Sequence, residues 1–210
     1  MFEKLRSIIF KLNPETAHNL AIKALKLNKI PNFSLDKSSQ KFLETKLFDI
    51  KIPNPIGVAA GFDKNAEVYN SLFNLNFGFV EVGTVTPLKQ YGNPKPRVFR
   101  LEEDEALINR LGFNNSGADI ISRYISDNKP KGLLGVNIGP NKDTKDRLND
   151  YSLCFKKFYN ICDYLTINIS SPNTENLRDF HDNEKLDNLL RELNEERIKI
   201  KSKIPLLVKI

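Results

Sequence analysis

The sequence predicts an α/β protein built on a parallel β-sheet. From about residue 40 onward, five apolar runs alternate with segments of helical character. The runs are apolar throughout instead of alternating, which is the pattern of parallel strands covered on both faces. This rhythm implies right-handed strand–helix–strand crossovers. The predicted strands are NPIGVAAG (54–61), FGFVEVGT (77–84), GLLGVNIG (132–139), YLTINIS (164–170) and PLLVKI (205–210).

Two short amphipathic helices are predicted ahead of the sheet. Apolar residues recur at helical spacing over residues 2–12. Asn13 and Pro14 then indicate the N-cap and first position of a second helix that runs to about Leu27. We expect residues 1–30 to form a helical hairpin and residues 31–210 to form the α/β domain.

Charge is concentrated in this hairpin. Residues 1–30 carry a net charge of +4, whereas residues 31–210 carry +2. Such a segment either packs on the domain as a lid or meets anionic lipid headgroups. Its basic residues are interleaved with aliphatic rather than aromatic residues, which favours a membrane surface over nucleic acid. With no apolar run of about 18 residues and no secretory signal, we expect a peripheral protein on the cytoplasmic face of the cell membrane rather than of the mitochondrial inner membrane.

Several familiar sites are not indicated. Cys154 and Cys162 have neither metal-site nor disulfide-framework spacing, so both are expected to be reduced thiols. No GxGxxG, Walker A or HExxH motif occurs. The two histidines, His18 and His181, are isolated in the sequence. No metal is predicted.

Four helices are predicted between the strands, at 65–74, 116–127, 148–161 and 183–202. The connection 85–115 is long and rich in proline, glycine and charge, and we expect a structureless functional loop there. The chain stops at Ile210 in an apolar strand that no later helix covers. We therefore expect the sequence to be a piece of a longer one.

Small and hydrogen-bonding residues gather where the predicted strands finish, above all in NISSPNTENL (168–177). A helix-capping role explains a single polar residue of this kind. It does not explain Asn137, Asn168 and Lys209 inside otherwise apolar strands, because a buried amide or ammonium without a partner costs several kcal/mol. Since parallel strands end on one side of the sheet, where ligands bind, a polar ligand is indicated there.

Six blocks of sequence occur in an order that resembles the class 2, quinone-dependent dihydroorotate dehydrogenases. They are GVAAGFDKN (57–65), EVGTVTP (81–87), GNPKPRVFRL (92–101), NRLGFNN (109–115), NIGPNKDT (137–144) and NISSPNT (168–174). NPETAH (13–18) resembles the start of the extra helix pair of that class. The soluble class has a cysteine in its catalytic loop, and neither cysteine of this chain lies there.

The resemblance implies a TIM (β/α)8 barrel that binds FMN at the strand ends, oxidation of (S)-dihydroorotate to orotate in pyrimidine synthesis, and ubiquinone as final electron acceptor. Ser171 would be the catalytic base, with Thr174 as an assistant. His18 and Arg100 match quinone-site positions more weakly. The implied FMN contacts are Ala60, Gly61, Lys64, Thr84, Asn137, Asn168 and Lys209. The implied substrate contacts are Lys64, Asn109, Arg110, Leu111, Gly112, Phe113, Asn168 and Asn173.

The chemistry suits these residue types. Desaturation removes a proton and a hydride from neighbouring carbons, so the base must face the substrate from the side opposite the flavin. Asparagines and Lys64 would orient the acid substrate. Lys209 would stabilise negative charge on the reduced ring.

Length departs from the family pattern. A closed barrel needs roughly 250 residues, and its phosphate site usually follows strands seven and eight. With about five strands, we expect an incomplete barrel that lacks the site for the FMN phosphate. One alternative is therefore that the 210-residue chain is an inactive fragment. Two further alternatives are a non-catalytic flavin- or phosphate-binding membrane module and another FMN barrel enzyme, such as a tRNA dihydrouridine synthase. The low charge of residues 31–210 disfavours the latter.

Overall fold

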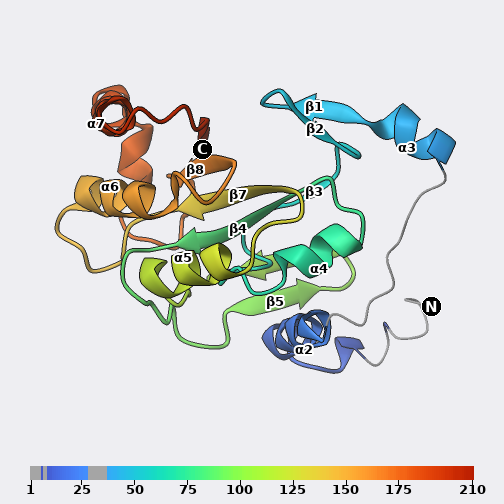
Figure 1. The fold of residues 1–210 in the computed structure, drawn as a ribbon. Coiled ribbons are helices and arrows are strands. Elements are labelled where there is room, and N and C mark those ends of the chain that lie inside the picture. Colours follow the sequence, from blue (N-terminus) through green and yellow to red (C-terminus); the bar gives the residue numbers. More distant parts are fainter. Residues whose placement is uncertain (1–5, 7–8, 28–36) are drawn as a thin grey trace.

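A computed structural model describes residues 6, 9–27 and 37–210 of the chain. Its centre is a five-stranded sheet in which all neighbouring strands are parallel (Figure 1). The strand order is β3-β4-β7-β8-β9, so each strand pairs with the next one of this sheet along the chain. The strands are β3 (Gly57–Val58), β4 (Phe79–Val85), β7 (Leu133–Ile138), β8 (Tyr164–Asn168) and β9 (Leu206–Lys209). All five predicted apolar runs are confirmed as strands, and the α/β class with them.

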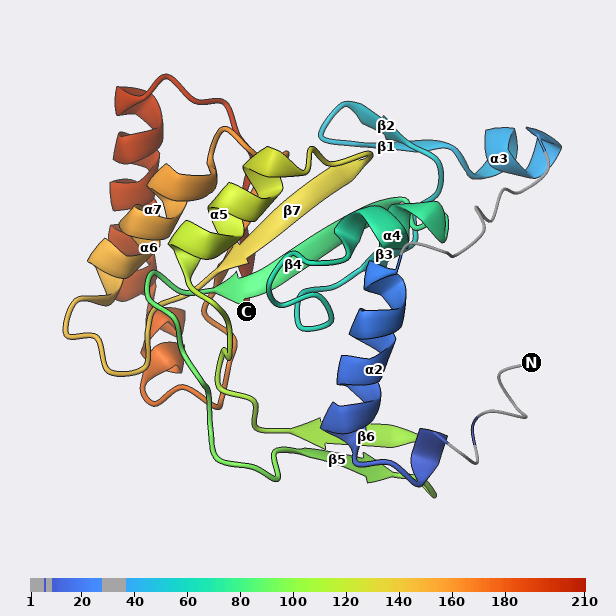
Figure 2. The same ribbon diagram turned by 60° about the horizontal axis from the view of Figure 1, so that its bottom comes forward.

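The four predicted crossover helices are also present, with shorter bounds. They are α4 (Tyr69–Asn74), α5 (Ala118–Asp127), α6 (Arg147–Phe158) and α7 (Asn183–Lys199). Figure 2 shows α5, α6 and α7 along the sheet. Every residue of β7 and β8 is buried, and one apolar cluster joins these strands to the helices. Burial on both faces explains why the strand sequences lack alternation.

Helix starts follow local capping chemistry. Asp146 accepts a hydrogen bond from the amide of Asn149 at the start of α6, and Asp182 accepts from the amides of Glu184 and Lys185 at the start of α7. Such side chains satisfy amides that have no partner within the helix. Residues 65–68 remain outside α4 because the buried Asp63 carboxylate accepts from the amides of residues 67 and 68 instead.

Two antiparallel hairpins were not predicted. The first joins β1 (Thr45–Leu47) to β2 (Ile50–Ile52), and Ile52 packs against Leu133 and Tyr164, the first residues of β7 and β8. It therefore covers the amino ends of these strands. The second joins β5 (Val98–Leu101) to β6 (Ala106–Asn109). The expectation of a structureless connection over 85–115 is therefore wrong, because the charged turn between the apolar halves 98–101 and 106–109 allows them to pair.

The N-terminal segment is described in part. The second predicted helix is α2 (Pro14–Lys26), and Asn13 caps it by accepting from the amide of Glu15 at 3.0 Å, as predicted. Of the first predicted helix, residues 6, 9 and 10 are helical, and most of the remainder lies outside the described residues. A short helix, α3 (Lys37–Leu43), and a 3-10 turn, η1 (Leu177–His181), complete the elements. Figure 2 shows α2 between the β5–β6 hairpin and α4.

Candidate active site

A pocket of about 290 Å³ opens at the carboxyl ends of the parallel strands. Most of the predicted site residues line it. From the strand ends and following loops these are Ala60, Gly61, Lys64, Thr84, Asn168, Ser171, Asn173 and Lys209. From the last residue of β6 and the segment after it they are Asn109, Leu111, Gly112 and Phe113. The sheet register accounts for part of this convergence, since Asn168 and Lys209 are paired positions at the ends of β8 and β9.

A connected set of polar side chains forms the floor of the pocket. The Thr84 hydroxyl donates to Asn137 Oδ1 at 2.6 Å and accepts from Asn168 Nδ2 at 2.9 Å. Asn168 Nδ2 also lies 3.1 Å from Asn137 Oδ1. Asn137 is fully buried and does not line the pocket, so its amide supports the other two side chains from beneath. Thr84, Asn137 and Asn168, all predicted from the strand ends, thus form one hydrogen-bonded cluster.

Glu81 on β4 anchors this cluster from below, and sequence reasoning missed it. Its carboxylate accepts from Asn137 Nδ2 at 2.9 Å and from the Thr166 hydroxyl at 2.8 Å. The first bond fixes which way the Asn137 amide faces, with its oxygen toward Thr84 and Asn168. A lone carboxylate inside the apolar run 77–84 was the available signal.

The loop after β8 turns sharply into the pocket. Asn168 Oδ1 accepts from both the amide and the hydroxyl of Ser170, at 3.1 and 2.9 Å. Ser171 Oγ accepts from the amide of Asn173 at 3.2 Å. Thr174 is buried and does not line the pocket. The polar residues of NISSPNTENL therefore serve two purposes, since some brace the loop and others face the cavity.

The opposite wall carries charge and open space. Burial lowers the pKa of the Lys64 ammonium, and the neighbouring Glu15 carboxylate partly opposes that shift. A side-chain carbon added at Gly61 would meet nothing within 4 Å, so the backbone there faces empty space. Next to Lys64, burial raises the pKa of Asp63 to about 6. This wall can receive a flat group against its backbone and an anion at Lys64.

The segment 109–113 closes the rim. Gln90 Nε2 donates to the Gly112 carbonyl at 2.9 Å, and Asn173 Nδ2 donates to the Asn109 carbonyl at 3.3 Å. Arg110 departs from the other predicted residues of this segment. It is absent from the pocket lining, and its guanidinium donates to the Pro96 carbonyl.

His18 on α2 and Arg100 on β5 both lie outside the pocket lining. His18 packs edge-on against Phe62 with 5.2 Å between ring centroids, and burial together with Lys64 lowers its pKa. Arg100 donates to the Leu12 carbonyl at 2.8 Å, and its guanidinium lies 4.8 Å from the Phe10 ring centroid.

Residues to which the sequence analysis assigned no role also contribute to the pocket. Gly83, Asn114, Ser170 and Pro172 complete the lining. The NISSPNT and NRLGFNN blocks contained three of these, but nothing in the sequence separates lining from bracing positions.

Other kinds of site find little support in the described part of the chain. No cluster of His, Cys, Asp and Glu suited to a metal ion occurs among the described residues. Both cysteines are free, and burial raises the pKa of each thiol. No helix within the described ranges is long and apolar enough to cross a bilayer.

A parallel α/β sheet with a polar pocket at its carboxyl ends defines the general class, in which ligands bind beyond the strand ends. Comparison with known sequences then gives the family. The model of the family "Dihydroorotate dehydrogenase" matches residues 42–210, and the chain belongs to that family.

Individual relatives agree with this assignment. The chain is 49% identical to a protein named "Dihydroorotate dehydrogenase (quinone)" from Bartonella tribocorum, over 98% of this chain and 57% of the relative. It is 47% identical to a protein of the same name from Haemophilus ducreyi, over all of this chain and 64% of that relative. The chain thus spans less than two thirds of the length of these curated relatives.

Solved structures show the same similarity. A crystal structure of DHODH from Eimeria tenella in complex with ferulenol superposes with a TM-score of 0.86 at 35% identity. The alignment covers 97% of this chain and 62% of that one. The ligand-free form from the same organism gives a TM-score of 0.86 at 36% identity, over 94% and 61% of the two chains.

Proposed function

We propose that this protein oxidises (S)-dihydroorotate to orotate in pyrimidine synthesis, with FMN as hydride acceptor and ubiquinone as final electron acceptor. The observation that carries the proposal is the convergence of Thr84, Asn168, Ser171, Asn173 and Lys209 on one strand-end pocket. Relatives at up to 49% identity that are named as quinone-dependent dihydroorotate dehydrogenases support it. Family membership also favours it over a tRNA dihydrouridine synthase.

A (β/α)8 barrel is part of this proposal. In such a barrel each parallel strand pairs with its successor, and the active site lies at the carboxyl ends. The observed order β3-β4-β7-β8-β9 and the position of the pocket agree with a segment of that architecture.

The residues present fit a flavin. Gly61 leaves open space for a flat ring, and the floor cluster offers hydrogen-bonding groups to its polar edge. The residues that would hold FMN are Ala60, Gly61, Lys64, Thr84, Asn168 and Lys209. Asn137, predicted as a direct contact, is fully buried and would act only by supporting Thr84 and Asn168. When bound, FMN supplies the acceptor for the hydride that leaves the substrate. A cation at Lys209 favours negative charge beside it.

Substrate would be oriented by the rim. Lys64 provides a cation for the carboxylate of dihydroorotate, while Asn109 and Asn173 provide amide groups for its ring. The segment Arg110–Phe113 would complete these contacts, with Leu111, Gly112 and Phe113 lining the pocket and Arg110 contributing through its backbone. Asn168 would contact both substrate and cofactor from the floor.

Ser171 would remove the proton. Its Oγ accepts the Asn173 amide at 3.2 Å, a hydrogen bond that favours negative charge on that oxygen. Proton transfer of this kind contributes about 10²–10⁴-fold to a rate. Thr174 is buried and does not line the pocket, which supports a role in bracing the loop rather than as a direct partner of Ser171.

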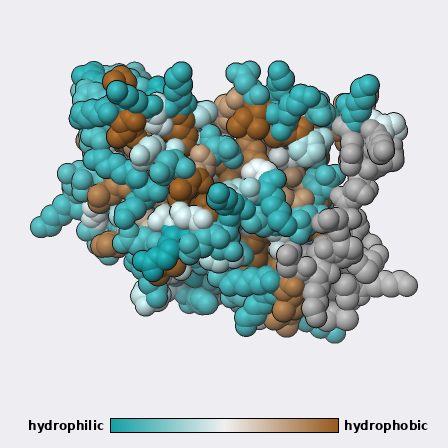
Figure 3. Space-filling view, viewed as in Figure 1, coloured by the Kyte–Doolittle hydropathy of each residue, from teal (hydrophilic) through white to brown (hydrophobic). Residues whose placement is uncertain are grey.

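The N-terminal region would serve the quinone step. His18 lies on α2, and Arg100 donates to the Leu12 carbonyl just before that helix. Leu12, Leu20 and Leu27 are exposed in the same region. In Figure 3, one of the hydrophobic patches lies beside the grey atoms, where Figure 1 draws α2. We include in the proposal that residues 1–30 form a hairpin that attaches the protein to the cytoplasmic face of the cell membrane, and that residues 31–210 bind FMN.

The test compares the parent protein with Ser171→Ala, after measuring bound FMN in both. We expect equal FMN content and a loss of about 10²–10⁴-fold in orotate formation with a soluble quinone. Parent protein that binds FMN yet forms no orotate would favour a non-catalytic flavin module. Unchanged turnover in Ser171→Ala would remove Ser171 from the mechanism.

A further inference from the structure

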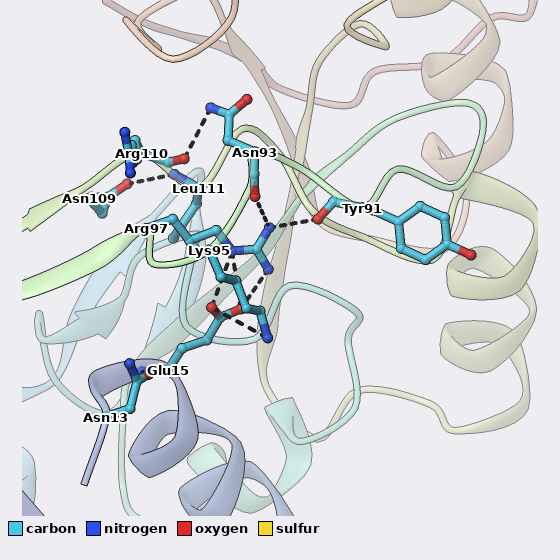
Figure 4. Close-up of polar contacts among 9 residues, drawn as sticks. All are labelled: Asn13, Glu15, Tyr91, Asn93, Lys95, Arg97, Asn109, Arg110 and Leu111. Atoms are coloured by element: carbon cyan, nitrogen blue, oxygen red, sulfur yellow. Dashed lines mark hydrogen bonds and ion pairs between the residues drawn. The ribbon is translucent and has the colours of Figure 1, made fainter.

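A nearly buried ion pair connects α2 to the loop 91–97. Arg97 Nη2 lies 2.5 Å from Glu15 Oε1, and the two side chains are only 6% and 13% exposed (Figure 4). Arg97 Nε adds contacts of 3.2 Å to both carboxylate oxygens. This hydrogen bonding is the main reason that the pKa of Glu15 is lowered. Multiple contacts between a guanidinium and a carboxylate fix relative orientation as well as distance.

Arg97 also holds its own loop in shape. Its Nη1 donates to the carbonyls of Tyr91 and Asn93, at 2.6 and 3.0 Å. Gly92 lies within this curl at φ +77°, and a Cβ there would lie 2.7 Å from Arg97 Nη1 and 2.2 Å from the Leu111 carbonyl oxygen. The loop can therefore close around the guanidinium and approach Leu111 only because residue 92 is glycine.

Asn93 connects this loop to the rim of the pocket. The backbone N–H of Asn93 donates to the Leu111 carbonyl at 3.0 Å, and its side-chain Nδ2 donates to the Arg110 carbonyl at 3.0 Å. The same Nδ2 lies 3.4 Å from the Asn173 carbonyl. A Cβ at Gly112 would lie 2.9 Å from it. Asn93 is therefore packed against both segments proposed to hold substrate, and Figure 4 shows it between Arg97 and Arg110.

We infer that Glu15, Arg97 and Asn93 are positioning residues that set the substrate-binding segment 109–113 from α2. This inference rests on the proposed function for the identity of the ligand. None of the three lines the pocket, so they act through backbone carbonyls of the rim. The chain of contacts makes α2, which carries His18, a support of the substrate site.

Because the ion pair is nearly buried, loss of the Glu15 carboxylate is expected to disturb Arg97 and its loop strongly. Removing one partner of a buried pair leaves the other charge uncompensated, so the remaining group moves to find water or a new partner. Arg97 cannot lose its proton. Without the Glu15 carboxylate, its guanidinium is expected to shift and to release the Tyr91 and Asn93 carbonyls.

Three variants separate this role from general charge effects. Glu15→Gln removes the negative charge at nearly constant size. Asn93→Leu removes both side-chain donor contacts to the rim, keeps the size of the side chain and adds no charge. Lys95→Ala is the matched control, because Lys95 is 65% exposed and its Nζ lies 3.7 Å from Glu15 Oε2 without contacting the rim.

Two measurements are made on the full chain. The first is the Kd of orotate, followed through the absorbance of bound FMN. We expect Glu15→Gln and Asn93→Leu each to raise it roughly tenfold, the effect of losing one good hydrogen bond. FMN content should be unchanged, and Lys95→Ala should remain within about twofold of the parent. The second is amide hydrogen exchange without ligand, which should accelerate in 91–97 and 109–112 but not in β7 or β8.

The results distinguish the possible failures. If the parent binds orotate and both variants bind it within about twofold of the parent, the positioning role is wrong. If the parent does not bind orotate, the proposed function is in doubt, and hydrogen exchange alone decides the coupling. Faster exchange confined to residues 91–97 and 109–112 supports the coupling between α2 and the rim. Unchanged exchange, or faster exchange throughout the domain, overturns that coupling. Should Glu15→Gln fail to fold, Asn93→Leu carries the same two tests.

Discussion

Replacing Asn168 by leucine tests the floor cluster most sharply. Asn168 is 4% exposed, and its side chain makes four hydrogen bonds, to Thr84, Asn137 and twice to Ser170. Leucine has a similar size and can make none of them. The Ser170 amide then loses its acceptor, and Thr84 Oγ1 loses a donor. Net values of about 0.5–1.5 kcal/mol for each of the four bonds give a loss of about 2–6 kcal/mol in the free energy of unfolding.

The assay is urea denaturation followed by far-ultraviolet circular dichroism, since the chain has no tryptophan to report unfolding. Ser170→Ala is the matched control, because it removes only the hydroxyl contact and retains the amide. We expect it to cost about 1 kcal/mol or less. If Asn168→Leu is no less stable than Ser170→Ala, the cluster does not hold the pocket floor and its role in shaping the site is wrong.

Two further predictions concern stability. The hydrogen bonds from Arg97 lower the folded-state pKa of Glu15 below its usual 4.5. The ion pair therefore stabilises the fold above that pH, and this stabilisation is lost as the pH falls through the folded pKa. Glu15→Gln should lose less stability in acid than the parent, and equal curves of stability against pH would contradict the ion pair. In Gly135→Ala the new Cβ would lie 2.0 Å from Tyr164 Cζ. We therefore expect overpacking to lower the free energy of unfolding by about 1–3 kcal/mol. A thermal midpoint equal to that of the parent would show that β7 and β8 are not packed as described.

Much of the site was predictable because polar residues inside apolar strands are unusual. Asn137 and Asn168 stood out for this reason, and the parallel arrangement placed the strand ends together. Glu81 obeys the same physics but was missed, since one carboxylate in an apolar run does not reveal that it faces two donors on neighbouring strands.

The β5–β6 hairpin and the Glu15–Arg97 pair show where sequence reasoning stops. The proline- and glycine-rich composition of 85–115 concealed two short strands that pair across a charged turn. Glu15 and Arg97 are 82 residues apart, and only the docking of α2 on β5 brings them together. Arg110 was grouped with its neighbours, yet its side chain leaves the pocket for the Pro96 carbonyl. Such outcomes depend on tertiary contacts that a local pattern does not encode.

The central claim is that one rim of the parallel sheet holds a flavin and an acid substrate against each other. Anaerobic addition of dihydroorotate to the FMN-loaded protein tests it most directly. We predict that the visible absorbance of the oxidised flavin is lost with the formation of one orotate per flavin, and that Ser171→Ala retains its flavin but bleaches far more slowly. Bound flavin that keeps its oxidised spectrum in the presence of saturating dihydroorotate would contradict the account.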